Sequence, residues 1–458
     1  MAEGILGRIV AAKRDELSVR FDGVSLDTLR TRARRTERSL SGALARAGAR
    51  FILEIKKASP SSGPIRPGAD VAGMARGYAG VADALSVLCD ANFFGGSLDD
   101  LVLARRQFEG PILAKDFFID PRQVAEARIA GADAVLVMLS VLDDEAARFM
   151  MAESARFGME SLVEVHDANE MRRALALGAP IIGINNRDLC DLSVDLATTE
   201  RLAPLAPDRL LISESGLSTR ADVDRLSAKV DGFLIGSALM RAADPGDAAR
   251  ALIFGRTKLC GLNRPEDFEA ARAATHVGLV LVPESPRALT LGEALRLAPL
   301  HPGLVGVFRN ASVEEVAKAA TMLGLVAVQL HGHEDASYVR ALARRLPRHC
   351  QIWKAIQVGR SIPGQFDAAD RLLFDNGSGG TGRAFDWDLI RNHPALGEAL
   401  VAGGIGLRNA REARRLGTYG IDVGSSLDER PGRKSPEKIA ALFDALRQPS
   451  RQLLRACA

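Results

Sequence analysis

The sequence predicts an α/β protein built from two tandem (β/α)8 TIM barrels, the first with an N-terminal helical extension. Short apolar runs alternate with amphipathic stretches along nearly all of the 458 residues. Runs that are apolar on both faces indicate strands of a buried parallel sheet, and the helical stretches between them indicate right-handed βαβ connections. The pattern produces eight strands and then eight more, and Gly- and Ser-rich loops close both octets. Each octet therefore fits one barrel.

The first eight strands are expected between residues 51 and 235. Helical segments with one apolar face separate them; in Asp120–Ala130 that face carries Val124 and Ala127. The expected strands are Phe51–Ile55, Leu85–Cys89, Ile112–Lys115, Ala134–Met138, Ser161–Val165, Ile181–Ile184, Leu210–Ser213 and Gly232–Ile235.

A second set of eight strands is expected between residues 257 and 423. No flexible linker separates the two sets, and we place the boundary near Phe254–Arg256. The barrels are thus expected at residues 51–255 and 256–448, followed by a disordered tail at 449–458. The expected strands are Thr257–Cys260, Val277–Val282, Val305–Val307, Val326–Gln329, Ile352–Ala355, Arg371–Phe374, Ala399–Ala402 and Gly420–Val423.

Residues 1–50 precede the first barrel and carry two helical patterns. One has Ile5 and Ile9 on a single face, and the other is Arg-rich and runs over Leu26–Ala47. The basic run Arg30–Arg35 is interpreted as a solvated helix face, because the surrounding charge is mixed.

Composition excludes several classes of protein. With 60 Lys and Arg against 57 Asp and Glu, the formal net charge is only +3, which gives no reason to expect nucleic acid or a membrane as a partner. Five scattered cysteines without a C-x-x-C pair are typical of free thiols in a reducing compartment. The N-terminus lacks the apolar core of a signal peptide, and no apolar run approaches the ~20 residues that span a bilayer. We therefore expect a cytoplasmic protein that acts as a monomer on small molecules.

In such a barrel the chemistry comes from the C-terminal ends of the strands and the loops that follow them. The first barrel carries many charges there, and buried charges are costly unless they are paired or used. A structural ion-pair network is the alternative interpretation of Glu54 and Lys115, but the convergence of all these charges on one mouth favours a functional site. The polar strand ends are Glu54, Lys56, Lys115, Glu164, Asn185, Glu214, Ser215, Gly236 and Ser237.

Small residues follow the last two strands of each barrel. Their backbone N–H groups, beside a helix N-terminus, form an anion site that suits phosphate. Ordinary turn chemistry is the alternative for any single loop, but it explains a coordinated pair of loops less well. Two such sites predict two reactions on sugar phosphates. The loops are Ser213–Gly216, Ile235–Ser237, Ala402–Gly404 and Gly424–Ser426.

The strand ends of the second barrel are Cys260, Gln329, His331, Asp375 and Asp422. A lone cysteine is most often a core filler. Facing a carboxyl group across a phosphate site, Cys260 becomes a candidate base, because the nearby cation of Lys258 favours the thiolate. His331 and His333, with a glycine between them and no third ligand beyond Glu334, do not predict a metal site, so no metal is expected.

The motifs of the first barrel resemble those of indole-3-glycerol phosphate synthase. The matching segments follow in the order of that family and reach the last strand. They are Glu54-Ile-Lys-Lys-Ala-Ser-Pro-Ser61, Ala114-Lys-Asp-Phe117, Leu162-Val-Glu-Val165, Gly183-Ile-Asn-Asn-Arg-Asp-Leu189, Ser213-Glu-Ser-Gly216 and Leu234-Ile-Gly-Ser-Ala-Leu-Met240.

The second barrel is similar to phosphoribosylanthranilate isomerase, so the chain resembles the bifunctional enzymes of bacterial tryptophan biosynthesis. One segment, Asp422–Asp428, departs from the usual Asp-Val-Ser-Ser-Gly-Val-Glu. Gly424 offers a backbone N–H but no hydroxyl, and we expect Ser425 to make that phosphate contact. The matching segments are Lys258-Leu-Cys-Gly-Leu262, Ser285-Pro-Arg287, Val305-Gly-Val-Phe-Arg-Asn310, Ala327-Val-Gln-Leu-His-Gly332, Phe374-Asp-Asn376, Gly379-Gly-Thr-Gly-Arg-Ala-Phe-Asp-Trp387 and Ala402-Gly-Gly404.

The resemblance implies that the second barrel acts first, in an Amadori rearrangement of N-(5-phosphoribosyl)anthranilate to 1-(2-carboxyphenylamino)-1-deoxyribulose 5-phosphate. Asp375, partly protonated through burial, would open the furanose as an acid, and Cys260 would take the C2 proton. Arg287 would face the anthranilate carboxylate. The other implied substrate contacts are Gln329, His331, Gly403, Gly404, Asp422, Gly424 and Ser425.

The first barrel would then close the indole ring with loss of carbon dioxide and water. Lys115 would protonate the ketone oxygen and Glu164 would assist loss of the hydroxyl, while Glu54 and Lys56 would orient and charge-balance the site. No cofactor is required, because the substrate's own amine drives both steps. The implied substrate contacts are Asn185, Glu214 and Ser215 at sugar hydroxyls, Ser59, Gly216, Gly236 and Ser237 at the phosphate, Phe94 and Phe117 at the anthranilate ring, and Arg187.

Related synthases place an extension like residues 1–50 near the active-site mouth. There it can help to hold the substrate and exclude water. We therefore expect removal of Met1–Ala47 to impair the first barrel and to spare the second.

Two rival interpretations remain open. Lys115 could form a Schiff base in a phosphate-binding aldolase barrel, or both barrels could bind sugar phosphates without chemistry. Borohydride trapping of a substrate on Lys115 would favour the aldolase over the synthase, and turnover assays would decide between an enzyme and a binding scaffold.

Overall fold

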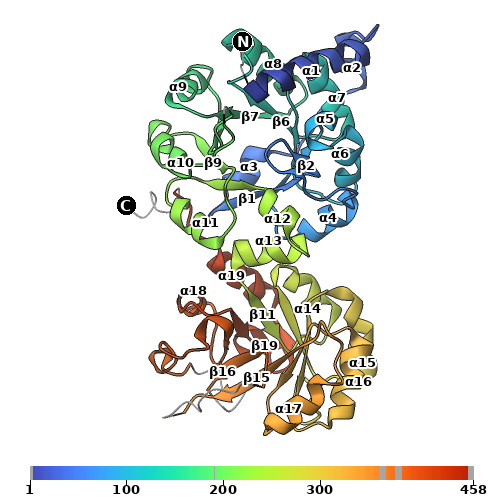
Figure 1. The fold of residues 1–458 in the computed structure, drawn as a ribbon, viewed down its shortest axis with the longest axis vertical. Coiled ribbons are helices and arrows are strands. Elements are labelled where there is room, and N and C mark those ends of the chain that lie inside the picture. Colours follow the sequence, from blue (N-terminus) through green and yellow to red (C-terminus); the bar gives the residue numbers. More distant parts are fainter. Residues whose placement is uncertain (1–3, 190, 360–367, 377–383, 452–458) are drawn as a thin grey trace. The chain divides into compact units, whose positions relative to one another are not determined.

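The computed structural model describes residues 4–189, 191–359, 368–376 and 384–451. Contacts within the chain divide it into two compact units, one of Met1–Ala249 with Gln448–Ala458 and one of Arg250–Arg447. Each unit contains one closed barrel of eight parallel strands, with helices around it (Figure 1). The predicted α/β class and the two tandem barrels are confirmed.

In the first barrel each strand pairs with the next one in the sequence, and β1 closes the ring by pairing with β10. All eight predicted strands are present, with ends shifted by at most one residue. The strands are β1 (Arg50–Ile55), β4 (Ala84–Leu88), β5 (Ile112–Lys115), β6 (Ala134–Met138), β7 (Glu160–Val165), β8 (Ile181–Asn185), β9 (Leu210–Glu214) and β10 (Gly232–Ile235), with a small hairpin of β2 (Ala58–Ser59) and β3 (Gly63–Pro64) after β1.

The helices around this barrel begin mostly at polar capping residues. Asp120, for example, caps the helix predicted at Asp120–Ala130, and its side chain accepts the N–H of Arg122. The helices are α4 (Val71–Tyr78), α5 (Ala91–Phe94), α6 (Leu98–Arg105), α7 (Pro121–Ala130), α8 (Asp144–Arg156), α9 (Ala168–Ala176), α10 (Ala197–Leu202), η1 (Ala203–Leu205), α11 (Arg220–Leu226), α12 (Ser237–Arg241) and α13 (Pro245–Phe254).

The second barrel has the same strand order, closed by pairing of β11 with β18. Its predicted strands are also all present, with ends shifted by at most two residues. The elements are β11 (Thr257–Cys260), α14 (Pro265–Ala270), η2 (Ala271–Ala273), β12 (His276–Val280), α15 (Leu291–Leu297), η3 (Ala298–Leu300), β13 (Leu304–Phe308), α16 (Val313–Leu323), β14 (Ala327–Leu330), α17 (Ala336–Ala343), β15 (Gln351–Gln357), β16 (Arg371–Asp375), η4 (Trp387–Leu389), η5 (Leu396–Glu398), β17 (Leu400–Val401), α18 (Ala410–Arg415), β18 (Gly420–Val423), η6 (Ser425–Leu427), β19 (Asp428–Arg430), β20 (Arg433–Lys434) and α19 (Pro436–Leu446).

The N-terminal extension contains three helices, α1 (Gly4–Arg20), α2 (Leu26–Arg32) and α3 (Leu40–Leu44), so the single helical pattern expected over Leu26–Ala47 is wrong. The chain leaves the helix after Arg32 because Thr36 makes two bonds to the barrel. Its N–H donates to the carbonyl of Phe157 at 2.8 Å, and its hydroxyl donates to the buried carboxylate of Asp133 at 2.6 Å. Tertiary hydrogen bonds thus override a helical pattern.

The basic run of the extension is largely exposed, as expected, at Arg32, Arg34 and Arg35. Two of its arginines nevertheless contact the first barrel. Arg30 forms an ion pair with the buried Glu153 of α8 at 2.6 Å, and Arg35 donates to the carbonyl of Arg156 at 2.7 Å. The periodicity of charge along a helix does not reveal that a buried acid lies on a neighbouring helix.

The last described residues return to the first unit. The carbonyl of Gln448 accepts the N–H of Ala49 at 2.8 Å, just before β1. Arg451, whose side chain is 6% exposed, pairs with the buried Asp231 at 2.9 Å and donates to the carbonyl of Ala206. Residues 448–451 are therefore part of the floor of the first barrel.

Some predictions fall outside the described residues, namely Cys190, Cys457, the motif segment 379–383 and the tail after residue 451. Cys89, Cys260 and Cys350 are free thiols. None of the helices in the described ranges has both the length and the apolar character that a bilayer crossing requires.

Candidate active sites

Each unit has a cavity at the C-terminal ends of its strands. The first cavity measures about 370 Å³ and the second about 540 Å³. Every described residue that lines a cavity belongs to the unit in which that cavity lies. Among the described residues, each site is therefore built from one unit alone.

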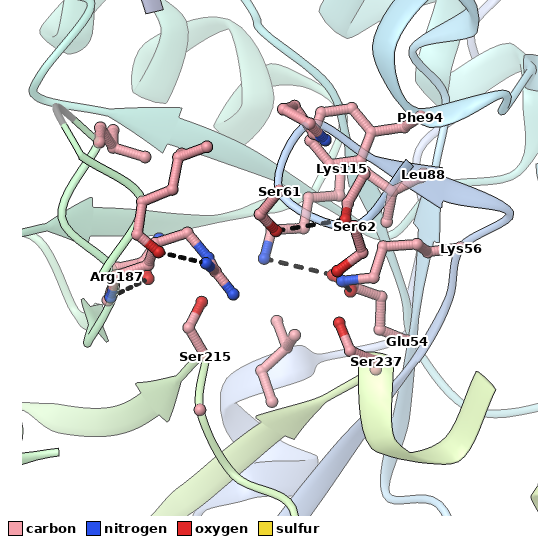
Figure 2. A pocket seen from close by; sticks show the side chains of 18 of the residues that line it. Glu54, Lys56, Ser61, Ser62, Leu88, Phe94, Lys115, Arg187, Ser215 and Ser237 are labelled. Atoms are coloured by element: carbon pink, nitrogen blue, oxygen red, sulfur yellow. Dashed lines mark hydrogen bonds and ion pairs between the residues drawn. The ribbon is translucent and has the colours of Figure 1, made fainter. Parts of the chain in front are cut away.

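Buried charges meet in the first cavity, as Figure 2 shows for Glu54, Lys56 and Lys115. Lys56 Nζ lies 2.6 Å from Glu54 Oε1, and Lys115 Nζ lies 3.3 Å from Glu54 Oε2. Lys115 also lies 2.8 Å from Glu214 Oε2, at the end of β9. Glu214 is fully buried behind Lys115 rather than in the cavity wall.

The pairing sets the protonation of these groups. Burial alone would raise the pKa of Glu54, but the ammonium groups of Lys56 and Lys115 outweigh it and lower that pKa to about 2. For Glu214, burial and repulsion from Glu164 raise the pKa in spite of Lys115. Burial would lower the pKa of Lys115, yet Glu214, Glu54 and Glu164 raise it well above its usual range.

A raised pKa bears on the rival interpretation of Lys115. Schiff-base chemistry requires a neutral amine, which enzymes obtain by lowering the pKa of a lysine. Lys115 contacts two carboxylates and is held as an ammonium ion. The geometry thus disfavours the aldolase and keeps Lys115 as a cation that can donate a hydrogen bond to a substrate oxygen.

Two glycines make room for the carboxylates. A Cβ on Gly183 would lie 2.0 Å from Glu214 Oε1, and one on Gly236 would lie 2.3 Å from Glu54 Oε1. Sequence reasoning assigned Gly236 to phosphate binding only. Its lack of a side chain is also required by the neighbouring acid.

The remaining predicted residues of the first site also line this cavity. The rings of Phe94 and Phe117 lie 6.1 Å apart, centroid to centroid, and Glu164 Oε1 lies 3.4 Å from His166 Nε2. The other predicted residues that line the cavity are Ser59, Asn185, Arg187, Ser215, Gly216, Gly236 and Ser237.

Sequence reasoning missed a set of lining residues, most of them apolar. Ile5 and Ile9 were noted as one helical face, but the pattern alone does not show that this face reaches the cavity. Apolar strand ends cannot be told from core residues by sequence. The missed residues include Ile5, Leu6, Ile9, Ser61, Ser62, Leu88, Met138, Leu234 and Arg241.

In the second cavity, Cys260 lies at the end of β11 beside a buried ion pair. Lys258 Nζ, which is fully buried, is 2.8 Å from Asp422 Oδ2. Burial raises the pKa of the Cys260 thiol, and Lys258 only partly offsets that rise. Lys258 therefore acts in the expected direction, but it does not make Cys260 a thiolate in the free protein.

Asp375 ends β16 and faces two polar side chains of β14 and its following loop. Its Oδ2 lies 3.2 Å from His331 Nε2, and its Oδ1 accepts the N–H of Asn376 at 2.7 Å. His331 Nδ1 in turn lies 3.2 Å from Gln329 Nε2. The candidate acid is thus held in one orientation.

Arg287 is held in place by the segment that departs from the isomerase pattern. Its guanidinium pairs with Asp428 at 2.5 Å, and Lys434 pairs with the other oxygen of that carboxylate at 2.7 Å. Asp428 therefore orients Arg287 at the wall of the cavity.

All the predicted residues of the second site line this cavity. Gly403 and Gly404 have positive φ angles of 75° and 66°, a conformation that favours glycine. Glu284 and Arg309 also line it and were not predicted as site residues, although Arg309 lies within the matching segment Val305–Asn310. Among the described residues, no group of three His, Cys, Asp or Glu side chains is placed to hold a metal ion.

Comparisons with known proteins match both units. The model of the indole-3-glycerol phosphate synthase family matches residues 6–252, and that of the N-(5'-phosphoribosyl)anthranilate (PRA) isomerase family matches residues 257–445. The tryptophan biosynthesis protein TrpCF of Salmonella typhi is 44% identical over 97% of this chain and 99% of its own length. TrpCF of Yersinia pestis is 47% identical over 87% of this chain and 84% of its own, and that of Vibrio parahaemolyticus is 43% identical over 98% and 95%.

Proposed function

The chain belongs to the family of bifunctional tryptophan-biosynthesis enzymes that join an indole-3-glycerol phosphate synthase to a phosphoribosylanthranilate isomerase, and we propose that its two cavities are the two active sites. The C-terminal barrel isomerises N-(5-phosphoribosyl)anthranilate to 1-(2-carboxyphenylamino)-1-deoxyribulose 5-phosphate. The N-terminal barrel converts that product to indole-3-glycerol phosphate, with loss of carbon dioxide and water.

One observation carries the assignment of the sites. Each family match coincides with one closed barrel, and the strand ends of that barrel surround a cavity with the acids and bases that its reaction needs. Fluorescence-monitored conversion of phosphoribosylanthranilate by the purified chain tests it. Absence of turnover in folded protein would support the scaffold interpretation.

In the isomerase barrel, Asp375 protonates the furanose oxygen, so that the C1–O bond breaks and an imine forms. Cys260, after its thiol has lost its proton to solvent, then removes the C2 proton as a thiolate, and the resulting enolamine tautomerises to the aminoketose. The fixed orientation of Asp375 supports the first role. The ammonium of Lys258 supports the second, because it favours the anionic sulfur when the thiol loses its proton.

The carboxylate and the phosphate of the substrate bind to different kinds of group. Arg287, oriented by Asp428, pairs with the anthranilate carboxylate. The phosphate accepts hydrogen bonds from the loops after the last two strands, at Gly403, Gly404, Gly424 and Ser425. Gln329, His331 and Asp422 contact the ribose chain.

In the synthase barrel, Lys115 donates to the ketone oxygen while the aromatic ring attacks the ketone carbon. Carbon dioxide then leaves from the ring carbon that has formed the new bond. The new hydroxyl leaves as water with assistance from Glu164. The charge of Lys115, maintained by Glu54 and Glu214, supports its role. Lys56, close to Glu54, binds the substrate carboxylate before it is lost.

The remaining contacts of the synthase follow from the cavity wall. Phe94 and Phe117 flank the anthranilate ring. The sugar hydroxyls meet Asn185 and Ser215, with Arg187 beside them, whereas Glu214 lies behind Lys115 and acts through that lysine. The phosphate is bound at Ser59, Gly216, Gly236 and Ser237, where loop N–H groups and hydroxyls meet.

We further propose that the barrels span residues 51–255 and 256–447, because Gln448 already belongs to the first unit, and that the enzyme acts as a cytoplasmic monomer without nucleic acid or membrane as a partner. Each cavity is lined by its own unit, so neither needs a second copy. The free thiols of Cys89, Cys260 and Cys350 suit a reducing compartment. Sedimentation velocity at assay concentrations tests the monomer, and a dimer would contradict it.

A further inference from the structure

A lysine of the N-terminal extension is buried where that extension meets the synthase barrel. Lys13 lies on α1, and its side chain is only 1% exposed. Its Nζ lies 2.9 Å from Asp90 Oδ2, 3.0 Å from Asp116 Oδ1 and 2.8 Å from Glu16 Oε2. One ammonium group therefore joins the extension to the residues that follow β4 and β5.

Both barrel carboxylates also hold the backbone next to residues of the cavity. Asp90 caps α5 by accepting the N–H of Phe93 at 2.7 Å, and α5 ends at Phe94. Asp116 follows Lys115 directly and accepts the N–H of Phe117 at 2.7 Å. Figure 2 shows Phe94 and Lys115 in the same wall of the cavity.

We propose that Lys13 is a positioning residue of the synthase, which fixes against helix α1 the segments after β4 and β5 that adjoin Lys115 and the ring-binding Phe94 and Phe117. The inference rests on the proposed function, because these three residues have to be the proton donor and the ring contacts of that reaction. Lys13 itself does not line the cavity and acts only through Asp90 and Asp116.

The charges show why a cation is needed at this point. Asp90 and Asp116 are both buried, and burial raises the pKa of Asp116 to about 6 even though Lys13 opposes that rise and Asp90 adds to it. If Lys13 is replaced, the buried carboxylates of Asp90 and Asp116 lose the cation that pairs with both of them. One of them would protonate or move, and the loop after β5 would shift with it.

The same helix supplies part of the wall. Ile5, Leu6 and Ile9 line the cavity, and Lys13 lies one turn after Ile9 on α1. A shift of about 1 Å in catalytic geometry can cost up to 10²-fold in rate. Loss of Lys13 is therefore expected to affect both the rate and the binding of the ring.

The test compares Lys13→Met with Arg20→Met in the full chain. Arg20 is also on α1 and also pairs with the barrel, through Glu126 of α7, and its other ion-pair partner is Glu16 rather than Asp90 or Asp116. We expect Lys13→Met to lower kcat/KM of the synthase about 10- to 100-fold, with a raised KM, and Arg20→Met to change it less than about threefold. The isomerase of the same molecules should be unchanged, and it reports folding of the rest of the chain.

The raised KM is the decisive readout, because partial unfolding lowers the apparent kcat and leaves KM unchanged. If Lys13→Met does not fold, Asp90→Asn and Asp116→Asn replace it. Asp90→Asn is expected mainly to raise KM, through Phe94, and Asp116→Asn mainly to lower kcat, through Lys115. Normal synthase kinetics in folded variants, or an equal loss in Arg20→Met, would overturn the proposal. A wild-type chain without synthase activity would instead refute the proposed function.

Discussion

The two barrels share one strand order, yet they arrange buried charge in different ways. In the first, Lys115 lies between Glu54 and Glu214, within a cluster that also includes Lys56. In the second, the ion pair of Lys258 and Asp422 lies beside the Cys260 thiol, and Asp428 holds a separate pair with Arg287. The fold therefore fixes where reactive groups lie, whereas the residues at the strand ends decide the chemistry.

The barrels also differ in what closes their mouths. Helix α1 of the extension contributes Ile5, Leu6 and Ile9 to the first cavity. The second cavity is walled by its own loops, including Arg287 and Pro431, which lies between β19 and β20. The first site therefore depends on a segment outside its barrel, whereas the described part of the second site is lined by its own barrel and loops.

The largest expected effect separates the two sites by mutation. Lys115→Ala should reduce synthase activity 10²- to 10⁴-fold, the range for loss of a general acid, and leave the isomerase nearly intact. Cys260→Ala should do the reverse. Steady-state assays of each half-reaction measure both. Loss of both activities in a still-folded variant would contradict independent sites.

Sequence reasoning predicted the barrels well because strands buried on both faces leave a strong signal. The Leu26–Ala47 helix was wrong because the bonds of Thr36 to Phe157 and Asp133 come from residues far away in the sequence. Local periodicity does not contain such contacts.

The site could be predicted where polar residues end strands, as Glu54 and Lys115 do. Apolar lining residues such as Met138 were missed, because an apolar residue at a strand end has the same sequence pattern as one in the barrel core. The neutral state of the Cys260 thiol was missed for another reason. It depends on the balance of burial against Lys258, which needs the structure.

A large effect is also expected from removal of the extension. Deleting Met1–Ala47 should lower synthase kcat/KM about 10²-fold, because it removes one wall of the cavity and the cation of Lys13. The isomerase should be spared. Kinetics of both half-reactions, with circular dichroism as a folding control, measure the effect. Equal damage to both reactions would contradict the comparison of the two mouths.

The third prediction concerns the C-terminal return to the first unit. Arg451→Met should lower the free energy of unfolding of that unit by roughly 3 kcal/mol, because Asp231 is buried and loses this ion pair. A fragment ending at Phe254 should fold and keep synthase activity with a similar loss of stability. Urea unfolding followed by circular dichroism tests both. A fragment as stable as the first unit of the full chain would show that residues 448–451 contribute nothing.

A smaller effect should separate the barrels by pH. Burial, with the charges of Arg256 and other cations, lowers the pKa of His276 to about 3, so that the unfolded chain binds a proton before the folded one does. The second barrel therefore loses stability as the pH falls below about 6.5. In the first barrel the lowered pKa of Glu54 costs stability only below about 4.5, and the raised pKa of Asp116 adds stability as the pH falls through about 6.

The two tryptophans of the chain, Trp353 and Trp387, both lie in the second unit, so their fluorescence follows that unit alone. Its urea midpoint should fall between pH 7.5 and pH 5, and His276→Gln should flatten the fall. A midpoint that does not change with pH in the unaltered chain would contradict the prediction.

The smallest effect is expected at the departure from the isomerase pattern. A Cβ on Gly424 would have Cys260 Cβ at 4.0 Å as its nearest neighbour, and Gly424 has a negative φ of −122°, so Gly424→Ser fits without strain. The added hydroxyl supplies one hydrogen bond to the phosphate, which should lower the isomerase KM about two- to threefold. Ser425→Ala should raise KM by at least as much, and the double variant should return to the starting value. If neither substitution changes KM, the backbone N–H groups alone bind phosphate at this loop, and the hydroxyl of Ser425 has not replaced the one that residue 424 lacks.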